Sequence, residues 1–282
     1  MADPIEIPAR IWVEPAAGAP PLPDDWRASA LLASVADGRR DGAEGRALLV
    51  SMRLAGSLGR RFSSPRAALR VVALDDATGR VAVGDPSDPD GAPVEVRPDA
   101  DAEGLVSTDA HVNFDLLDLL GLQADGRPRR VFAWLDELIT PLLPLRTPGG
   151  PAGEAPPLPD RPTHLVGEAP ALDVGPAGVA LRVDFAPELD RRSAWDAVIR
   201  GAVRLPEGRP RWVALLCLVQ RTRDVFAVVD VLPPGEAGQV VGFSLPMERL
   251  ARGAFAGGGR FFVGVAGGAR SDPLLVQPQP PP

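Results

Sequence analysis

The sequence predicts a mainly β protein made of two tandem antiparallel β-sandwich domains, with a short helix in the N-terminal one. Three observations lead to this expectation. Short apolar runs alternate with a period of two residues, as in half-buried strands. The 33 prolines and 30 glycines are spread along the 282 residues and separate these runs with turns. Strand-like runs also recur in a similar order on both sides of a proline- and glycine-rich stretch, which indicates a repeat.

The strand-like runs of the two halves correspond in order rather than in residue identity, and the last pair aligns only with a two-residue gap. In the final run, Phe261, Val263 and Val265 fall on one face, so that face is expected to pack into a core. The expected N-terminal strands lie at 9–15, 47–56, 68–76, 80–86, 106–120 and 130–145. The expected C-terminal strands lie at 178–185, 196–206, 211–220, 225–233, 239–250 and 259–276.

Residues 24–40 of the N-terminal half predict a helix that covers an edge or an end of the sandwich. The helix would begin at Asp24 or Asp25, whose carboxylate can accept from free backbone amides, and would end at Gly38. Its apolar face would consist of Ala28, Leu31, Leu32 and Val35. A second short helical turn is expected within 114–122.

These elements predict four regions along the chain. An N-terminal sandwich domain with the helical insertion spans 1–146, and a Pro/Gly-rich linker spans 147–174. A C-terminal sandwich domain spans 175–276, and a frayed, polyproline-like tail spans 277–282.

The pattern of short alternating strands resembles the general immunoglobulin or fibronectin type III sandwich. The resemblance covers most of the chain loosely and rests on no diagnostic motif. The paired cysteines of antibody domains are missing, because Cys217 is the only cysteine. The resemblance implies a fold, and no functional residue is carried over from it.

Charge and composition narrow the classes of partner. A net charge of -7 and a pI near 5.0 argue against nucleic acid and against anionic membranes as partners. The sequence shows no secretory signal pattern and no apolar run of membrane-spanning length, so a cytoplasmic location is the default expectation.

Few residues suggest catalysis. The sequence contains no lysine, which excludes Schiff-base and P-loop lysines. Cys217 lies in an apolar run and is expected to be a buried, poorly nucleophilic thiol. On an extended strand Asp109, His111 and Asp115 share a face, and they either form a weak metal site or general base, or simply line a solvated face, which we favour. The second histidine, His164, falls in the expected linker.

The acidic stretch 84–104 offers carboxylates that calcium could use, and its candidate ligands are Asp85, Asp88 and Asp90. A hydrated loop is the competing interpretation, because the stretch does not match the EF-hand pattern. No other metal or cofactor is predicted.

The apolar segment 134–145 is the predicted contact region, with Trp134, Leu138, Ile139 and Leu142 as candidate partner contacts. The expected function is a non-catalytic protein-interaction or structural module that binds a protein partner or itself. Two alternatives stay open. One is an accessory protein that binds calcium or carbohydrate, and the other is an enzyme with an Asp/Glu/Arg site between the domains.

Overall fold

The structure is a computed structural model, and it confirms that the protein is mainly β. It describes residues 4–8, 11–62, 68–86, 99–100, 106–150, 172–176, 178–185, 197–205, 212–232, 236–246 and 259–277. The chain divides into two compact units. The first unit contains 1–74 and 82–154, and the second contains 75–81 and 155–282. The predicted linker and the domain boundaries around it remain predictions, since 151–171 lie outside the described residues.

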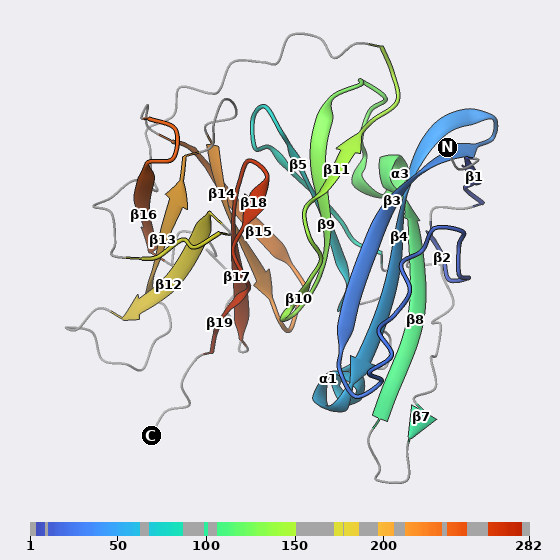
Figure 1. The fold of residues 1–282 in the computed structure, drawn as a ribbon, viewed down its shortest axis with the longest axis horizontal. Coiled ribbons are helices and arrows are strands. Elements are labelled where there is room, and N and C mark those ends of the chain that lie inside the picture. Colours follow the sequence, from blue (N-terminus) through green and yellow to red (C-terminus); the bar gives the residue numbers. More distant parts are fainter. Residues whose placement is uncertain are drawn as a thin grey trace. The chain divides into compact units, whose positions relative to one another are not determined.

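The first unit contains two sheets (Figure 1). In the first sheet the order is β1-β3-β4-β8-β2, with β7 on β8, and in the second it is β10-β9-β5-β6, with β11 on β9. Strands β3, β4 and β8 pair antiparallel, whereas β1 runs parallel to β3. The first sheet is formed by β1 (Ile5–Glu6), β2 (Ile11–Trp12), β3 (Ala30–Arg40), β4 (Ala43–Ala55), β7 (Asp99–Ala100) and β8 (Val106–Asp115). The second is formed by β5 (Arg70–Asp75), β6 (Val81–Gly84), β9 (Pro128–Leu135), β10 (Leu138–Ile139) and β11 (Leu143–Arg146).

Both sheets of the first unit contribute to one core. Leu48, Val50 and Met52 of β4 are buried there together with Val71 of β5 and Val131 of β9. The core residues of these strands occur at every second position, as the sequence predicts for strands that turn one face toward a core.

The second unit also has two sheets, and its strands pair antiparallel. Their orders are β12-β13-β16 and β15-β14-β17-β18, with β19 on β17. A core shared by both sheets includes Ile199, Leu215, Cys217, Phe243 and Phe262. The strands are β12 (Val179–Phe185), β13 (Ala197–Arg204), β14 (Trp212–Val219), β15 (Val225–Val231), β16 (Val240–Pro246), β17 (Arg260–Ala266), β18 (Ala269–Arg270) and β19 (Leu274–Val276).

The short turn at 75–81 belongs to the second unit. The indole Nε1 of Trp212 donates to the carbonyl of Asp76 at 3.0 Å. A Cβ at Gly79, whose φ is +68°, would lie 2.6 Å from the Trp212 ring, so this turn position requires glycine. Asp76 and Trp212 are 136 residues apart, so no local sequence pattern predicts this contact.

The predicted helix at 24–40 is wrong, because Ala30–Arg40 forms strand β3 and pairs with β4 along its whole length. Leu31, Ala33 and Val35 alternate toward the core, and this period-two pattern prevails over the helical spacing. The turn after β3 holds Asp41 at φ 51° and Gly42 at φ 81°, the left-handed pair that Asp-Gly provides in a two-residue hairpin. That dipeptide was the missed signal.

The helical turn predicted within 114–122 is present as α3 (Leu116–Leu120). The carboxylate of Asp115 accepts from the amides of Leu117 and Asp118, and Gly121 ends the helix with φ 60°. A second helix, α1 (Gly56–Arg61), follows β4. The helices among the described residues lack the length and apolar character of a membrane-spanning segment.

The hairpin geometry leads to a stability prediction. Gly42→Ala should destabilise the protein by about 1–2 kcal/mol, because a Cβ is unfavourable at a left-handed φ. Urea unfolding followed by circular dichroism measures the change. Gly150→Ala is the control, since a Cβ there meets open space, and equal effects of the two substitutions would contradict the assigned turn.

A candidate interaction site on the first sheet

The face of β4 that points away from the core is buried as well. Leu49 and Ser51 on this outer face are 0% exposed and Arg53 is 8% exposed, although their neighbours Leu48, Val50 and Met52 already fill the core. The outer face must therefore be covered by another part of the chain. Hydrogen bonds identify the cover as the coil between β2 and β3, residues 13–29, which we call the strap (Figure 1).

Side chains from three neighbouring strands hold the backbone of the strap and of the adjoining β2. The amide Nδ2 of Asn113 on β8 donates to the carbonyls of Trp12 at 3.3 Å and Glu14 at 2.7 Å. The hydroxyl of Ser34 on β3 donates to the carbonyl of Gly18 at 2.8 Å. Each of these bonds goes to a backbone oxygen, so the contacts are largely independent of the side chains that the strap carries.

Arg53 on β4 provides the third anchor. Its Nη1 donates to the carbonyl of Pro23 at 2.6 Å, and its Nε and Nη2 bond both carboxylate oxygens of Asp109 at 2.7 Å each. These hydrogen bonds, which Arg53 donates to Asp109, raise the pKa of Arg53. The fork geometry holds the guanidinium rigid, so that its remaining donors keep a fixed direction toward the strap.

A small apolar cluster adds to these polar contacts. Ala47 and Leu49 on the outer face pack with Trp12, Ala16 and Ala19 of the N-terminal segment. The strap also makes a local turn, since the amide of Ala19 donates to the carbonyl of Ala16 and Gly18 has φ +89°. At its far end, Ser29 and Ala55 exchange two hydrogen bonds. The strap is thus fixed at both ends and along its middle.

The three residues of the predicted Asp109–His111–Asp115 cluster do not come together. Asp109 pairs with Arg53, whereas His111 lies opposite Ser51 and its Nδ1 is 3.2 Å from the serine hydroxyl. Asp115 caps α3, six residues further along the strand, which is about 20 Å of extended chain. Across the part of the chain that the structure describes, no three His, Cys, Asp or Glu side chains are grouped to hold a metal ion.

Of the predicted calcium ligands, only Asp85 is described. Its carboxylate is exposed and lies 3.2 Å from Nη1 of the buried Arg70. Asp88 and Asp90 lie outside the described residues. Calcium binding by the acidic stretch therefore stays a prediction.

The predicted partner contacts are placed differently from one another. Trp134 is 0% exposed and its Nε1 donates to the carbonyl of Asp136 at 2.8 Å, so this indole is an interior side chain. Leu138, Ile139 and Leu142 are half-buried along β10 and the following turn. A contact through these three residues remains a prediction.

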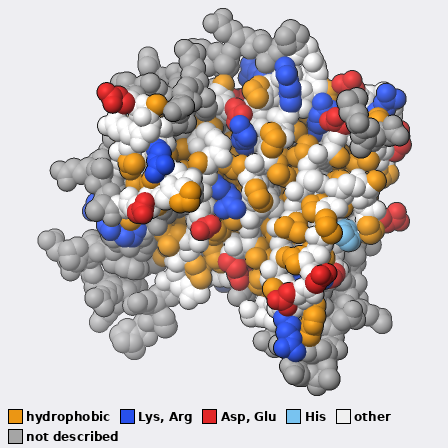
Figure 2. All heavy atoms as spheres, in the orientation of Figure 1, with side chains coloured by type: hydrophobic (Ala, Val, Ile, Leu, Met, Phe, Trp, Pro, Cys, Tyr) orange, Lys and Arg blue, Asp and Glu red, His pale blue; other side chains and the backbone are white. Residues whose placement is uncertain are grey.

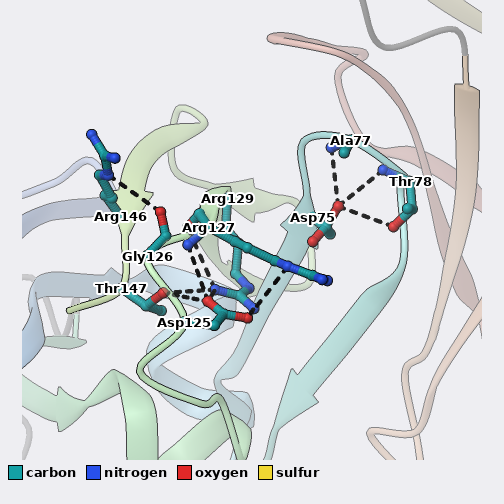
Figure 3. A network of polar contacts seen from close by, with 9 residues as sticks. All are labelled: Asp75, Ala77, Thr78, Asp125, Gly126, Arg127, Arg129, Arg146 and Thr147. Carbon is teal, nitrogen blue, oxygen red and sulfur yellow. Dashed lines mark hydrogen bonds and ion pairs between the residues drawn. The ribbon is translucent and has the colours of Figure 1, made fainter. Parts of the chain in front are cut away.

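A separate polar network connects the start of β9 with the end of β11 (Figure 3). The carboxylate of Asp125 accepts two hydrogen bonds from Arg129, at 2.8 and 2.7 Å, and one from the hydroxyl of Thr147 at 2.7 Å. These bonds, above all those from Arg129, lower the pKa of Asp125 below its usual value. Because the carboxylate is fully engaged, the network stabilises the structure and offers no free acid or base.

Cys217 is buried on β14, as the sequence predicts. Burial raises the pKa of its thiol to about 12. A thiol of this kind is a poor nucleophile at neutral pH, since the thiolate is the reactive form.

The surface carries both signs of charge. On the face that Figure 2 presents, basic and acidic side chains are interspersed with hydrophobic ones. In comparisons with known proteins, no family model and no curated protein matches the chain.

Sequence reasoning missed the three anchors Ser34, Arg53 and Asn113. Each is a polar residue at an outward position of a strand whose neighbouring residues are apolar. That pattern signals a polar contact on the second face of a sheet. The identity of the contact was not visible, because the partner residues are 16 to 101 positions away along the chain.

The Asp125 network leads to a pH-dependent prediction. The pKa of Asp125 is lower in the folded protein than in the unfolded chain. The ionised carboxylate therefore adds its full share to the free energy of unfolding above the unfolded pKa near 3.8, and this share is lost as the pH falls toward the folded pKa. Asp125→Asn should therefore cost about 1–3 kcal/mol at pH 7 and progressively less below pH 4. Urea unfolding at both pH values tests this, with Asp37→Asn as the matched variant, because that carboxylate is 79% exposed. A difference that does not change with pH would refute the assignment.

The buried thiol leads to a reactivity prediction. At pH 8 a pKa of about 12 leaves roughly one thiolate in 10,000, compared with about a quarter for an exposed cysteine. Cys217 should therefore react with a thiol reagent only after unfolding. The rate of colour release from a chromogenic disulfide, measured in buffer and in denaturant, tests this; fast reaction of the folded protein would contradict the burial.

Proposed function

We propose that the chain is a non-catalytic protein-interaction module built from two immunoglobulin- or fibronectin-like β-sandwiches, and that the outer face of its first sheet binds an extended peptide segment. The observation that carries this proposal is the set of side-chain donors on three adjacent strands, Ser34, Arg53 and Asn113, directed at backbone carbonyls of an extended segment.

The strand order supports the sandwich part of the proposal. In the first unit β3, β4 and β8 are neighbours, and β5 lies between β9 and β6. In the second unit β12, β13 and β16 are neighbours, and β14 lies between β17 and β15. Of the six strands just named in each unit, taken in chain order, the first, second and fifth lie in one sheet and the third, fourth and sixth in the other. With β11 and β19 added beside β9 and β17, this is the order expected of an A-B-E sheet facing a G-F-C-C′ sheet.

Two further features favour binding over catalysis. The outward-facing polar side chains of β4 and β8 are already engaged, Asp109 by Arg53 and Ser51 by His111. Ser51 is also 0% exposed with the strap in place. The donors that remain directed outward reach backbone carbonyls, and backbone recognition of this kind is how modules bind extended peptides.

Peptide display on the full chain tests this function. The chain for display carries Gly18→Val, which disfavours the φ of +89° and loosens the strap. We expect this chain to enrich extended peptides that no longer bind once Asn113→Leu and Ser34→Ala are added. Glu137→Ala, an exposed residue between β9 and β10, is the matched control and should leave binding unchanged. If no peptide is enriched, or if the enriched peptides bind equally without the donors, the proposal fails.

A further inference from the structure

The strap contains a hexapeptide that occurs twice in the chain. Ala-Pro-Pro-Leu-Pro-Asp stands at 19–24 and again at 155–160. In the ten-residue windows 15–24 and 151–160, only two positions differ, namely Ala17 with Gly153 and Gly18 with Glu154. The structure describes the first copy, and its contacts show which positions matter for docking.

Every position of the first copy that faces the sheet has the same residue in the second copy. Within 15–24 the half-buried residues are Ala16, Ala19, Pro20 and Leu22, and the others are exposed. The second window has the same residue type at each of these four positions, and both differences fall on exposed positions. The second copy therefore carries the complete contact surface of the first.

The backbone of both windows also matches the donors of the sheet. Proline has no N–H, and four of the ten residues in each window are proline, so such a segment lacks several of the donors that a strand added to a sheet edge would use. Its carbonyls remain free to accept. Ser34 and Arg53 donate to two of these carbonyls, those of Gly18 and Pro23. The outer face is thus suited to a proline-rich segment in particular.

One of the two sequence differences favours docking of the first copy over the second. Gly18 has φ +89°, a conformation that glycine adopts easily and other residues rarely. The second window has Glu154 at this position, so it docks less tightly than the first. The strap is also tethered beside the face, which gives it a high effective concentration there. Both effects favour residues 15–24 as the resident occupant.

We propose that the outer face of β3, β4 and β8 is a docking site for residues 151–160 of a second copy of this chain, and that the strap occupies the site in the resting protein. This inference rests on the proposed function, because it names the segment which that face binds. Exchange of the strap for the second segment would link two chains.

A labelled synthetic peptide of residues 151–162 tests the docking by fluorescence anisotropy with full-length protein. The variant Gly18→Glu gives the strap the residue of the second copy and removes its advantage. We expect this variant to bind the peptide at least about tenfold more tightly than the unchanged chain, as a difference of 1.4 kcal/mol implies. Adding Arg53→Met and Ser34→Ala, which removes the two donors to carbonyls of the repeated window, should abolish binding, and a scrambled peptide should not bind.

Sedimentation velocity tests whether a second copy of the chain supplies the docked segment. Gly18→Glu should form dimers at tens of micromolar protein, and the free peptide or Leu158→Asp should return it to the monomer. Peptide binding by a chain that stays monomeric would overturn the second copy as the source. Failure of this peptide, when display has selected other peptides for the same face, would overturn the inference and leave the proposed function standing.

A measurement on the unchanged protein covers the case in which Gly18→Glu does not fold. Amide exchange at residues 16–19 should accelerate when the peptide is added in millimolar excess, since the strap is then displaced. Exchange that is the same with and without the peptide counts against the docking site.

Discussion

Burial of β4 on both faces is the constraint from which the rest of the first unit follows. A unit made of two sheets can bury only one face of each sheet in its core. Strand β4 nevertheless carries apolar residues on both of its faces, and every residue of Ala47–Leu54 is buried. The second face needs a third layer, and the N-terminal segment provides it. The segment adds β1 and β2 to the sheet edges and lays the strap across the middle.

The polar residues of the outer face follow from the nature of this layer. A proline-rich segment has few N–H donors but a carbonyl at every residue, and a buried carbonyl needs a donor. Serine, arginine and asparagine at outward positions supply such donors at spacings that the strand register fixes. Asp109 then balances the charge of Arg53, which the strap would otherwise bury against neutral carbonyls. One constraint thus accounts for the cover, the donors and the ion pair.

Local patterns predicted the strands but not the contacts between distant segments. The runs that became β4, β5, β8, β9, β14 and β17 were found because each is a short, mainly apolar run bounded by turn residues. Residues 24–40 misled because Leu31 and Val35 fit both a helical and a two-residue period, and the Asp41–Gly42 turn decided for the strand. Asp109, His111 and Asp115 do not form the alternative cluster, because an extended chain rises about 3.3 Å per residue and residues on one face can still lie far apart. The strap contacts could not be read locally, since Asn113 and Glu14 are 99 residues apart.

The way in which the strap is attached decides what its release requires. Residues 11–12 pair with β8 and Ser29 bonds to Ala55, so both ends of the strap are held by contacts outside the docking face. Lifting the middle therefore leaves β1, β2 and the core in place. The lost contacts would be two carbonyl bonds and a few half-buried side chains, whose net contribution is small compared with the stability of a domain. A competing segment that restores the same bonds meets a nearly balanced exchange, and the left-handed turn at Gly18 is then enough to set its direction.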